Sequence, residues 1–222
     1  MNNIFLNYYI DKKQERQEEL DFCFYANFWK LENTHFYILV NREQEKIFYQ
    51  KKFEGKHYPQ SISIIEKEER PTFNDYFDLT RVYSKDADIN IIPNSDIIIP
   101  KETLKLIPKY FEENNKRCLA LTRWDIIKLE NYENNSVLFN RVDSQDIWVF
   151  KGKVPYISGA DFTLGMRGCD NAIAHILEQN GYEVINPSIT LKTYHFHKTG
   201  IRNYNQDSEA VPPPYKLLTP TI

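Results

Sequence analysis

Hydrophobic and polar residues alternate through the first part of the chain in a pattern that predicts a strand, a helix and a second strand. Two short apolar runs, at residues 4–9 and 35–40, are typical of buried strands. Between them, apolar residues recur every three or four positions from residue 20 to residue 28, which is helical spacing. Asp11 is the expected N-cap of this helix. The chain is therefore expected to open as a β-α-β arrangement.

The rest of the chain continues this alternation at first and then loses it. Further expected elements are a weaker strand at 61–65; a helix at 71–83 entered through Pro71 and Thr72; strands at 89–92 (extended by 97–99), 117–122, 146–151, 182–185 and 189–197; an amphipathic stretch at 101–113 that Pro108 should kink; and a helix at 170–180 closed by Gly181. Because helices separate the strands mainly in the first half, we expect a mostly parallel sheet covered on both faces, with a mixed or antiparallel patch in the second half.

Length and charge narrow the class of protein. The chain has 222 residues, of which 41% are hydrophobic, and this suits one large domain. With no repeat or linker visible, we expect a domain over residues 1–205 and a Pro-rich extended tail over 206–222. A net charge of -3 argues against nucleic acid as the main partner. Three cysteines without CxxC spacing, no signal peptide and no long apolar run predict a cytoplasmic protein without an integral membrane segment.

Two acidic motifs lie close together, and only one is expected at a ligand-binding edge. In open α/β sheets, ligands bind beyond the carboxyl ends of the strands. The D-x-D sequence at 86–88 precedes the strand at 89–92, whereas the N-S-D sequence at 94–96 follows it. We therefore expect Asp96 to bind a divalent cation that bridges a diphosphate, with Asn94 offering a neutral oxygen or a hydrogen bond to a ribose. An ordinary polar turn is the alternative.

Two histidines near the end of the chain are the second candidate feature. Residues two apart on a strand point to the same side, so His195 and His197 are expected to share a face. Either imidazole can serve as a further metal ligand. A pair of half-buried strand histidines without a ligand is the alternative.

Two carboxylates are candidate general bases. Asp170 stands at the start of the helix at 170–180, where it can act as an N-cap or take a proton from an acceptor hydroxyl. Its rival is Asp146, in a polar cluster before the strand that follows it.

Several arginines are candidate partners for negative charge. Arg16 lies on the apolar stripe of the first helix, near the end of the first strand, where it can meet a phosphate or a base; a surface arginine with a packed stem is the alternative. Arg70, Arg123 and Arg202 are further candidates for neutralising a leaving group, and the sequence does not rank them.

Four groups of segments, taken in order, resemble glycosyltransferases of the A-type fold, including the small glycosyltransferase-like domains of large DNA viruses and of bacterial surface-polysaccharide loci. The segments are residues 4–9 with Arg16; residues 94–97; residues 121–125 leading to 144–148; and residues 168–171 with 186–188 and 194–197. The resemblance covers most of the chain, from residue 4 to about residue 204. It implies a single-domain GT-A (Rossmann-like) α/β fold with a mixed, mostly parallel sheet flanked by helices, a nucleotide-sugar donor, and Mn²⁺ or Mg²⁺ as cofactor.

The resemblance also implies roles for particular residues. The nucleotide would be held by Tyr8, Tyr9 and Arg16. The metal and the diphosphate would be bound by Asn94, Ser95 and Asp96, and the metal also by His195 or His197. In an inverting enzyme the acceptor proton would go to Asp170, and the donor sugar and the acceptor would be lined by Trp124 with residues 144–148. The chain departs from the family pattern at Asn94, where a first aspartate is common, so the motif supplies one carboxylate only.

The resulting hypothesis is metal-assisted, inverting transfer of a sugar from a nucleotide-diphosphate donor, with a UDP-sugar favoured, to a hydroxyl acceptor on a glycan. Nucleotidyl transfer is disfavoured because residues 7–14 contain no glycine to admit a triphosphate. A non-catalytic sugar- or nucleotide-binding module on the same fold is the alternative from another class.

Overall fold

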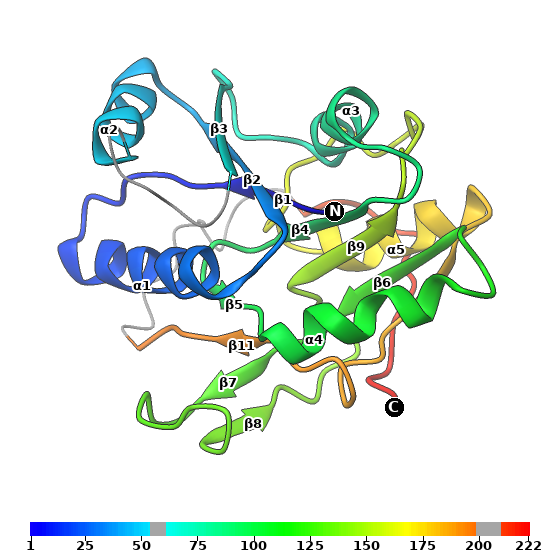
Figure 1. Ribbon diagram of the computed structural model, residues 1–222. Helices are drawn as coiled ribbons and strands as arrows, with labels where there is room; N and C mark the ends of the chain where they lie inside the picture. The colour runs from blue at the N-terminus through cyan, green and yellow to red at the C-terminus, as the bar shows by residue number, and fades with distance from the viewer. Residues whose placement is uncertain (54–60, 199–209) are drawn as a thin grey trace.

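The computed structural model describes residues 1–53, 61–198 and 210–222, which form an α/β protein built around one large sheet and one small sheet (Figure 1). The elements, in chain order, are β1 Asn2–Asn7, α1 Gln14–Lys30, β2 Thr34–Val40, α2 Glu43–Phe53, β3 Ser61–Glu66, α3 Phe73–Tyr83, β4 Ile89–Pro93, β5 Ile97–Ile98, α4 Lys101–Leu106, a 3₁₀ helix Ile107–Phe111, β6 Arg117–Leu121, β7 Trp124–Ile126, β8 Ser136–Leu138, β9 Ile147–Lys151, α5 Cys169–Gln179, β10 Glu183–Ile185 and β11 Tyr194–His195.

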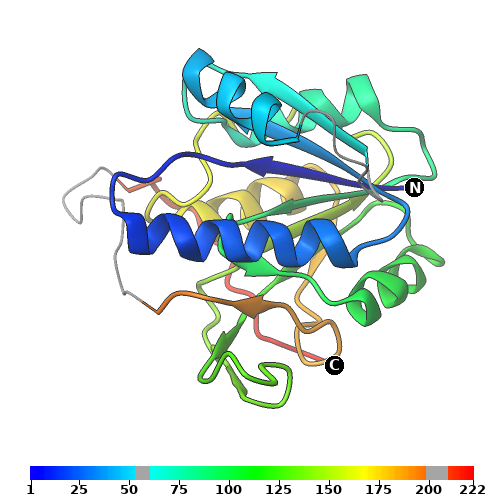
Figure 2. The same cartoon turned by 60° about the vertical axis from the view of Figure 1, so that its left-hand side comes forward.

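The large sheet has the strand order β10-β6-β9-β4-β1-β2-β3. β1 to β4 run parallel, as their β-α-β connections require, and β9 lies antiparallel between β4 and β6. The predicted mostly parallel sheet with an antiparallel patch from the second half is therefore confirmed. Helices α1, α2 and α4 pack on one face, and α3 and α5 pack on the other (Figures 1 and 2).

The small sheet has the order β5-β11-β7-β8 and lies below α1 in the view of Figure 1. β11 is antiparallel to β5 and parallel to β7. Two expectations are corrected here. Residues 97–99 do not extend β4, because Ile97 and Ile98 pair with β11 instead. The strand expected over 189–197 is only Tyr194–His195.

Helix starts and short elements account for the other differences. Asp11 does not cap α1; Lys13 occupies the N-cap position, and Asp11 Oδ1 accepts a hydrogen bond from the Lys13 backbone N–H at 2.8 Å. Asp170 does not cap α5 either, because Gly168 is the N-cap, with a φ of 78° that suits glycine. The sequence prediction also missed α2, β7 and β8.

The proline in the stretch 101–113, in contrast, acted as expected. α4 ends at Leu106 and continues as a 3₁₀ helix containing Pro108, which is the predicted disruption. Thr72 caps α3 through a capping box with Asp75. None of the helices in the described ranges is long and apolar enough to cross a membrane.

Residues 210–222 are extended and packed against the domain; the expected boundary at 205/206 lies outside the described residues. Backbone N–H groups of this tail donate to carbonyls in three separate regions of the domain: Val211 to Arg167 at 2.9 Å, Lys216 to Asn171 at 2.9 Å, Leu218 to Val142 at 2.8 Å and Thr221 to Asn186 at 2.8 Å. The tail thus ties together the start of α5, the loop before β9 and the loop after β10.

A pair of neighbouring leucines tests this packing. Leu218 is 5% exposed and Leu217 is 57% exposed. We expect Leu218→Ala to lower the free energy of unfolding by about 2–4 kcal/mol, because it empties a buried site. Leu217→Ala should change it by less than about 0.5 kcal/mol. Urea unfolding measures both, and equal midpoints for the two variants would contradict the packing of the tail.

Candidate metal and catalytic site

The N-S-D segment lies at the carboxyl end of β4, as the strand-end rule predicts. Three backbone or side-chain contacts anchor it: the Asn94 N–H donates to the Asp146 carbonyl at 2.8 Å, the Ser95 hydroxyl donates to the Asn7 carbonyl, and the Asp96 carbonyl accepts from the Phe196 N–H at 3.1 Å. The segment is therefore fixed to the ends of three other elements.

The rejected D-x-D sequence lies at the opposite edge of the sheet, before β4 begins. Asp88 there accepts the N-terminal ammonium of Met1 at 3.1 Å and the Lys85 N–H at 2.8 Å. Asp88 is therefore a structural carboxylate, and Asp86 beside it is exposed.

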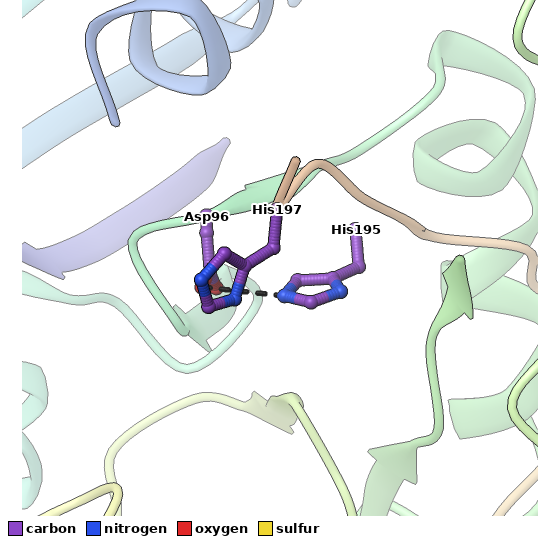
Figure 3. A group of neighbouring side chains, drawn as sticks. All are labelled: Asp96, His195 and His197. Carbon is purple, nitrogen blue, oxygen red and sulfur yellow. Dashed lines mark ion pairs between the residues drawn. The ribbon is translucent and has the colours of Figure 1, made fainter. Parts of the chain in front are cut away.

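Asp96, His195 and His197 converge on one point (Figure 3). One potential ligand atom from each residue lies within 4.8 Å of the others. His195 Nε2 is 3.3 Å from Asp96 Oδ2, and the two imidazole rings are 5.4 Å apart at 85°. The sequence offered one or the other histidine as a metal ligand, and the structure brings both close to Asp96, although His197 lies beyond the end of β11.

The cluster suits a divalent cation. The His197 Nε2 atom is buried and has no hydrogen-bond partner among the described residues, which is a costly state for a lone polar atom. Burial also lowers the pKa of His197, so that its ring is neutral and its nitrogen lone pair is free at pH 7. Two imidazoles and one carboxylate form a mixed nitrogen and oxygen ligand set that suits a divalent transition metal better than Mg²⁺, which prefers oxygen ligands alone.

Charges around Asp96 set its ionisation. Burial acts to raise the pKa of Asp96, but hydrogen bonds and charges from His195 and Arg16 outweigh it and hold this pKa well below its usual range. Burial alone would lower the pKa of His195, but hydrogen bonds to Asp125 and Asp96 raise it to about 9. Without a metal, the site therefore contains an aspartate paired with an imidazolium.

Arg16 is an immediate partner of Asp96. Its Nη2 atom is 2.6 Å from Asp96 Oδ2, and its Nη1 atom is 2.9 Å from Glu19 Oε2. Arg16 and Glu19 are both buried. The arginine that the sequence assigned to the nucleotide is thus engaged by two carboxylates, and it holds Asp96 in place.

Arg123 bridges the carboxylates of Asp125 and Asp146. Its Nε atom donates to Asp125 Oδ1 at 2.8 Å, and its Nη1 atom donates to Asp146 Oδ1 at 3.1 Å. Asp146 also accepts from Asn94 Nδ2 at 3.1 Å. The guanidinium carbon lies 3.9 Å from the centre of the Phe139 ring, which fixes the arginine from a further side.

Asp170 is the carboxyl group suited to move a proton. It is the second residue of α5 and accepts hydrogen bonds at 3.4 Å from the Gln145 backbone N–H and from Cys169 Sγ. Burial, together with the negative charge of Asp146, raises its pKa to about 7. Burial also raises the pKa of Asp146, and the positive charge of Arg123 opposes this rise. The two carboxyl groups therefore differ: Asp146 has an arginine partner, and the pKa of Asp170 lies near neutrality.

The remaining candidates differ in their access to a ligand. Tyr8 is fully buried between α1 and α2, where its ring contacts Phe24 and Tyr49, so it belongs to the core and offers no surface to a nucleotide. Tyr9 is half-buried beside α1. Trp124 is half-buried; its Nε1 atom donates to the Ser188 carbonyl at 2.9 Å.

Arg70 and Arg202 complete the set. Arg70 is exposed and lies against the loop before α5, where a side chain on Gly165 would come within 2.6 Å of its Nη2 atom. Arg202 lies outside the described residues. Sequence reasoning assigned no role to Asp125. Its position two residues after Arg123 was the available signal, because residues two apart on a strand point to the same side and can form an ion pair.

Comparison with known proteins identifies the fold. No protein-family model and no curated protein matches the chain. Among solved structures, the mannosyltransferase PcManGT from Pyrobaculum calidifontis, in complex with GDP-Man and Mn²⁺, superposes with a TM-score of 0.53 at 13% identity, over 90% of this chain and 58% of that one. The chain therefore has the fold of this transferase and spans somewhat more than half of its length.

Two further structures give weaker matches. TarS from S. aureus in complex with UDP-GlcNAc has a TM-score of 0.39 at 12% identity, over 57% of this chain and 35% of that one. Mannose-6-phosphate isomerase from Helicobacter pylori has a TM-score of 0.38 at 12% identity, over 68% and 70%. Neither similarity is close enough to support an argument.

Proposed function

We propose that this chain is a metal-dependent glycosyltransferase that moves a sugar from a nucleoside-diphosphate donor, with a UDP-sugar favoured, to a hydroxyl group of a glycan, with inversion. Residues 1–205 would form the catalytic domain and residues 206–222 its tail. The observation that carries the proposal is the convergence of Asp96, His195 and His197 at the carboxyl end of β4. In this fold, that edge is where ligands bind.

The solved transferase with the same fold supports the choice of ligands. That structure is a complex with GDP-Man and Mn²⁺, so its fold accommodates a nucleotide sugar together with a divalent metal. The donor set here, with two imidazoles, favours Mn²⁺ over Mg²⁺.

Each residue of the site has a role in this reaction. Asp96, His195 and His197 would hold the cation, which when bound stabilises the negative charge on the departing diphosphate. Asp170 would accept the proton of the acceptor hydroxyl, since its pKa of about 7 lets it exchange a proton near neutral pH. The negative charge of Asp146, which pairs with Arg123, would raise the affinity of Asp170 for that proton. Tyr9, Asn94, Ser95, Arg70 and Trp124 are partly or fully exposed and would be available for contacts with the donor.

A donor panel tests the proposal. We expect the purified protein to release nucleoside diphosphate from one member of a set of UDP-, GDP- and dTDP-sugars, with Mn²⁺ more effective than Mg²⁺. Protein treated with EDTA should be inactive until Mn²⁺ is returned, because the ligand cluster is then empty of its cation.

Binding measurements separate the two classes of function. Calorimetric titration of each nucleotide, with and without Mn²⁺, shows whether a donor binds even where it is not turned over. Binding without release of diphosphate to water or to any glycan acceptor would favour the non-catalytic binding module. An absence of both binding and turnover would rule out the transferase.

A further inference from the structure

Asp125 lies directly opposite His195 in the small sheet. The parallel pairing of β11 with β7 places these two residues in register. Their side chains meet on the same side, with 2.8 Å between Asp125 Oδ1 and His195 Nδ1. The pairing of two short strands is therefore what brings this carboxylate to this histidine.

This contact determines which ring nitrogen of His195 faces the other two members of the cluster, Asp96 and His197. A carboxylate only accepts hydrogen bonds, so Nδ1 carries the hydrogen in this pair. The other nitrogen, Nε2, is the atom 3.3 Å from Asp96. When His195 is neutral, its lone pair is thus on Nε2 and points toward Asp96 and His197.

The carboxylate of Asp125 is itself held. Arg123 Nε donates to the same Oδ1 atom at 2.8 Å, and Arg123 is fixed in turn by Asp146 and by the face of Phe139. A histidine restrained through such a partner keeps its ring plane and its tautomer without rearrangement when a cation binds.

We propose that Asp125 is a positioning residue for the metal site: it holds His195 as the Nδ1–H tautomer with Nε2 presented to a divalent cation. This inference rests on the proposed metal site and goes beyond it, because Asp125 lies outside the ligand cluster. Arg123 supports the same function by orienting the Asp125 carboxylate.

The proposal is tested without any substrate by titrating the full chain with Mn²⁺ alone. The EPR signal of free Mn²⁺ measures how much of the metal is bound. Asp125→Ala should weaken Mn²⁺ binding by about 10- to 100-fold. Asp125→Asn should stay within about 5-fold of the wild type, because its amide oxygen still accepts the Nδ1 hydrogen. With Zn²⁺ as a diamagnetic probe, NMR of ¹⁵N-labelled histidine should show a protonated Nδ1 on His195 in the wild type and in Asp125→Asn.

Asp143→Ala is the matched control. Arg141 and Asp143 repeat the spacing of Arg123 and Asp125, with 2.8 Å between Arg141 Nε and Asp143 Oδ1, but this pair is more exposed and has no histidine partner among the described residues. Its loss should leave Mn²⁺ binding unchanged.

The outcomes separate the two proposals. A wild-type protein that does not bind Mn²⁺ would reject the metal site itself. A wild type that binds Mn²⁺, with Asp125→Ala binding it equally well, would reject only the role of Asp125. Should Asp125→Ala fail to fold, Asp125→Asn decides: a loss as large as that of His195→Ala would show that accepting a hydrogen bond is not the function of this side chain.

Discussion

Replacing Asp96 with asparagine is expected to reduce metal-dependent turnover by at least about 1,000-fold, which corresponds to roughly 4 kcal/mol of lost transition-state stabilisation. Asp96 is the only carboxylate of the Asp96-His195-His197 cluster, so its charge is the main electrostatic attraction for a cation there. The measurement is the rate of nucleoside diphosphate release with saturating Mn²⁺. Retention of wild-type turnover would reject Asp96 as a metal ligand.

Two variants distinguish a metal effect from a folding effect. His197→Ala removes a ring nitrogen that makes no hydrogen bond within the described structure, so it should abolish Mn²⁺ binding with little change in melting temperature. Asp86→Asn alters the D-x-D sequence at the opposite edge of the sheet, where the side chain is exposed, and it should leave both turnover and stability unchanged. A drop in activity in Asp86→Asn would indicate that the active site lies at the D-x-D edge of the sheet and would contradict its assignment to Asp96.

Replacing Asp170 with asparagine is expected to lower kcat by about 100- to 10,000-fold, the usual contribution of a general base. In the wild type, kcat/KM should rise with pH and level off above the pKa of about 7 that burial gives Asp170, since only the ionised form accepts a proton. The asparagine variant should lose this limb of the pH profile. A wild-type profile that is flat between pH 5 and pH 9 would argue for a different base.

The same substitution should stabilise the protein at high pH. The raised pKa means that folding favours the protonated form, so the folded state retains a proton that an unfolded aspartate, with a pKa of 3.8, has released. Between about pH 4 and pH 7 the stability contributed by this group therefore falls as pH rises. We expect Asp170→Asn to melt about 3–8 °C above the wild type at pH 8, with the difference vanishing near pH 4. A lower melting temperature at pH 8 would show that the carboxylate is stabilised in the fold.

Local signals in the sequence were sufficient to predict the edge of the sheet that carries Asp96, His195 and His197. The apolar run of β4 and the polar residues after it placed Asp96, because the end of a strand can be read from neighbouring residues. His195 and His197 were matched to one face by strand alternation alone. Their shared contact with Asp96 required the pairing of β11 with β5, which no local pattern encodes.

Features that depend on distant parts of the chain escaped prediction. Tyr8 became a core residue because α2 covers it with Tyr49, and α2 shows no clear apolar stripe in its sequence. The ion pair between Arg16 and Asp96 spans 80 positions. The contact between Asp125 and His195 depends on the register of two strands that are only two and three residues long.

The position of β11 in the small sheet also has a consequence for biosynthesis. β11 is the last strand of the described chain, yet it lies between β5 and β7, which the ribosome makes much earlier. A nascent chain that ends before residue 194 carries Asp96 but neither histidine, and its small sheet has a gap where β11 belongs. Domains generally fold as units during synthesis. We therefore expect the Asp96-His195-His197 cluster to form only after residue 197 has been made and β11 has inserted between β5 and β7.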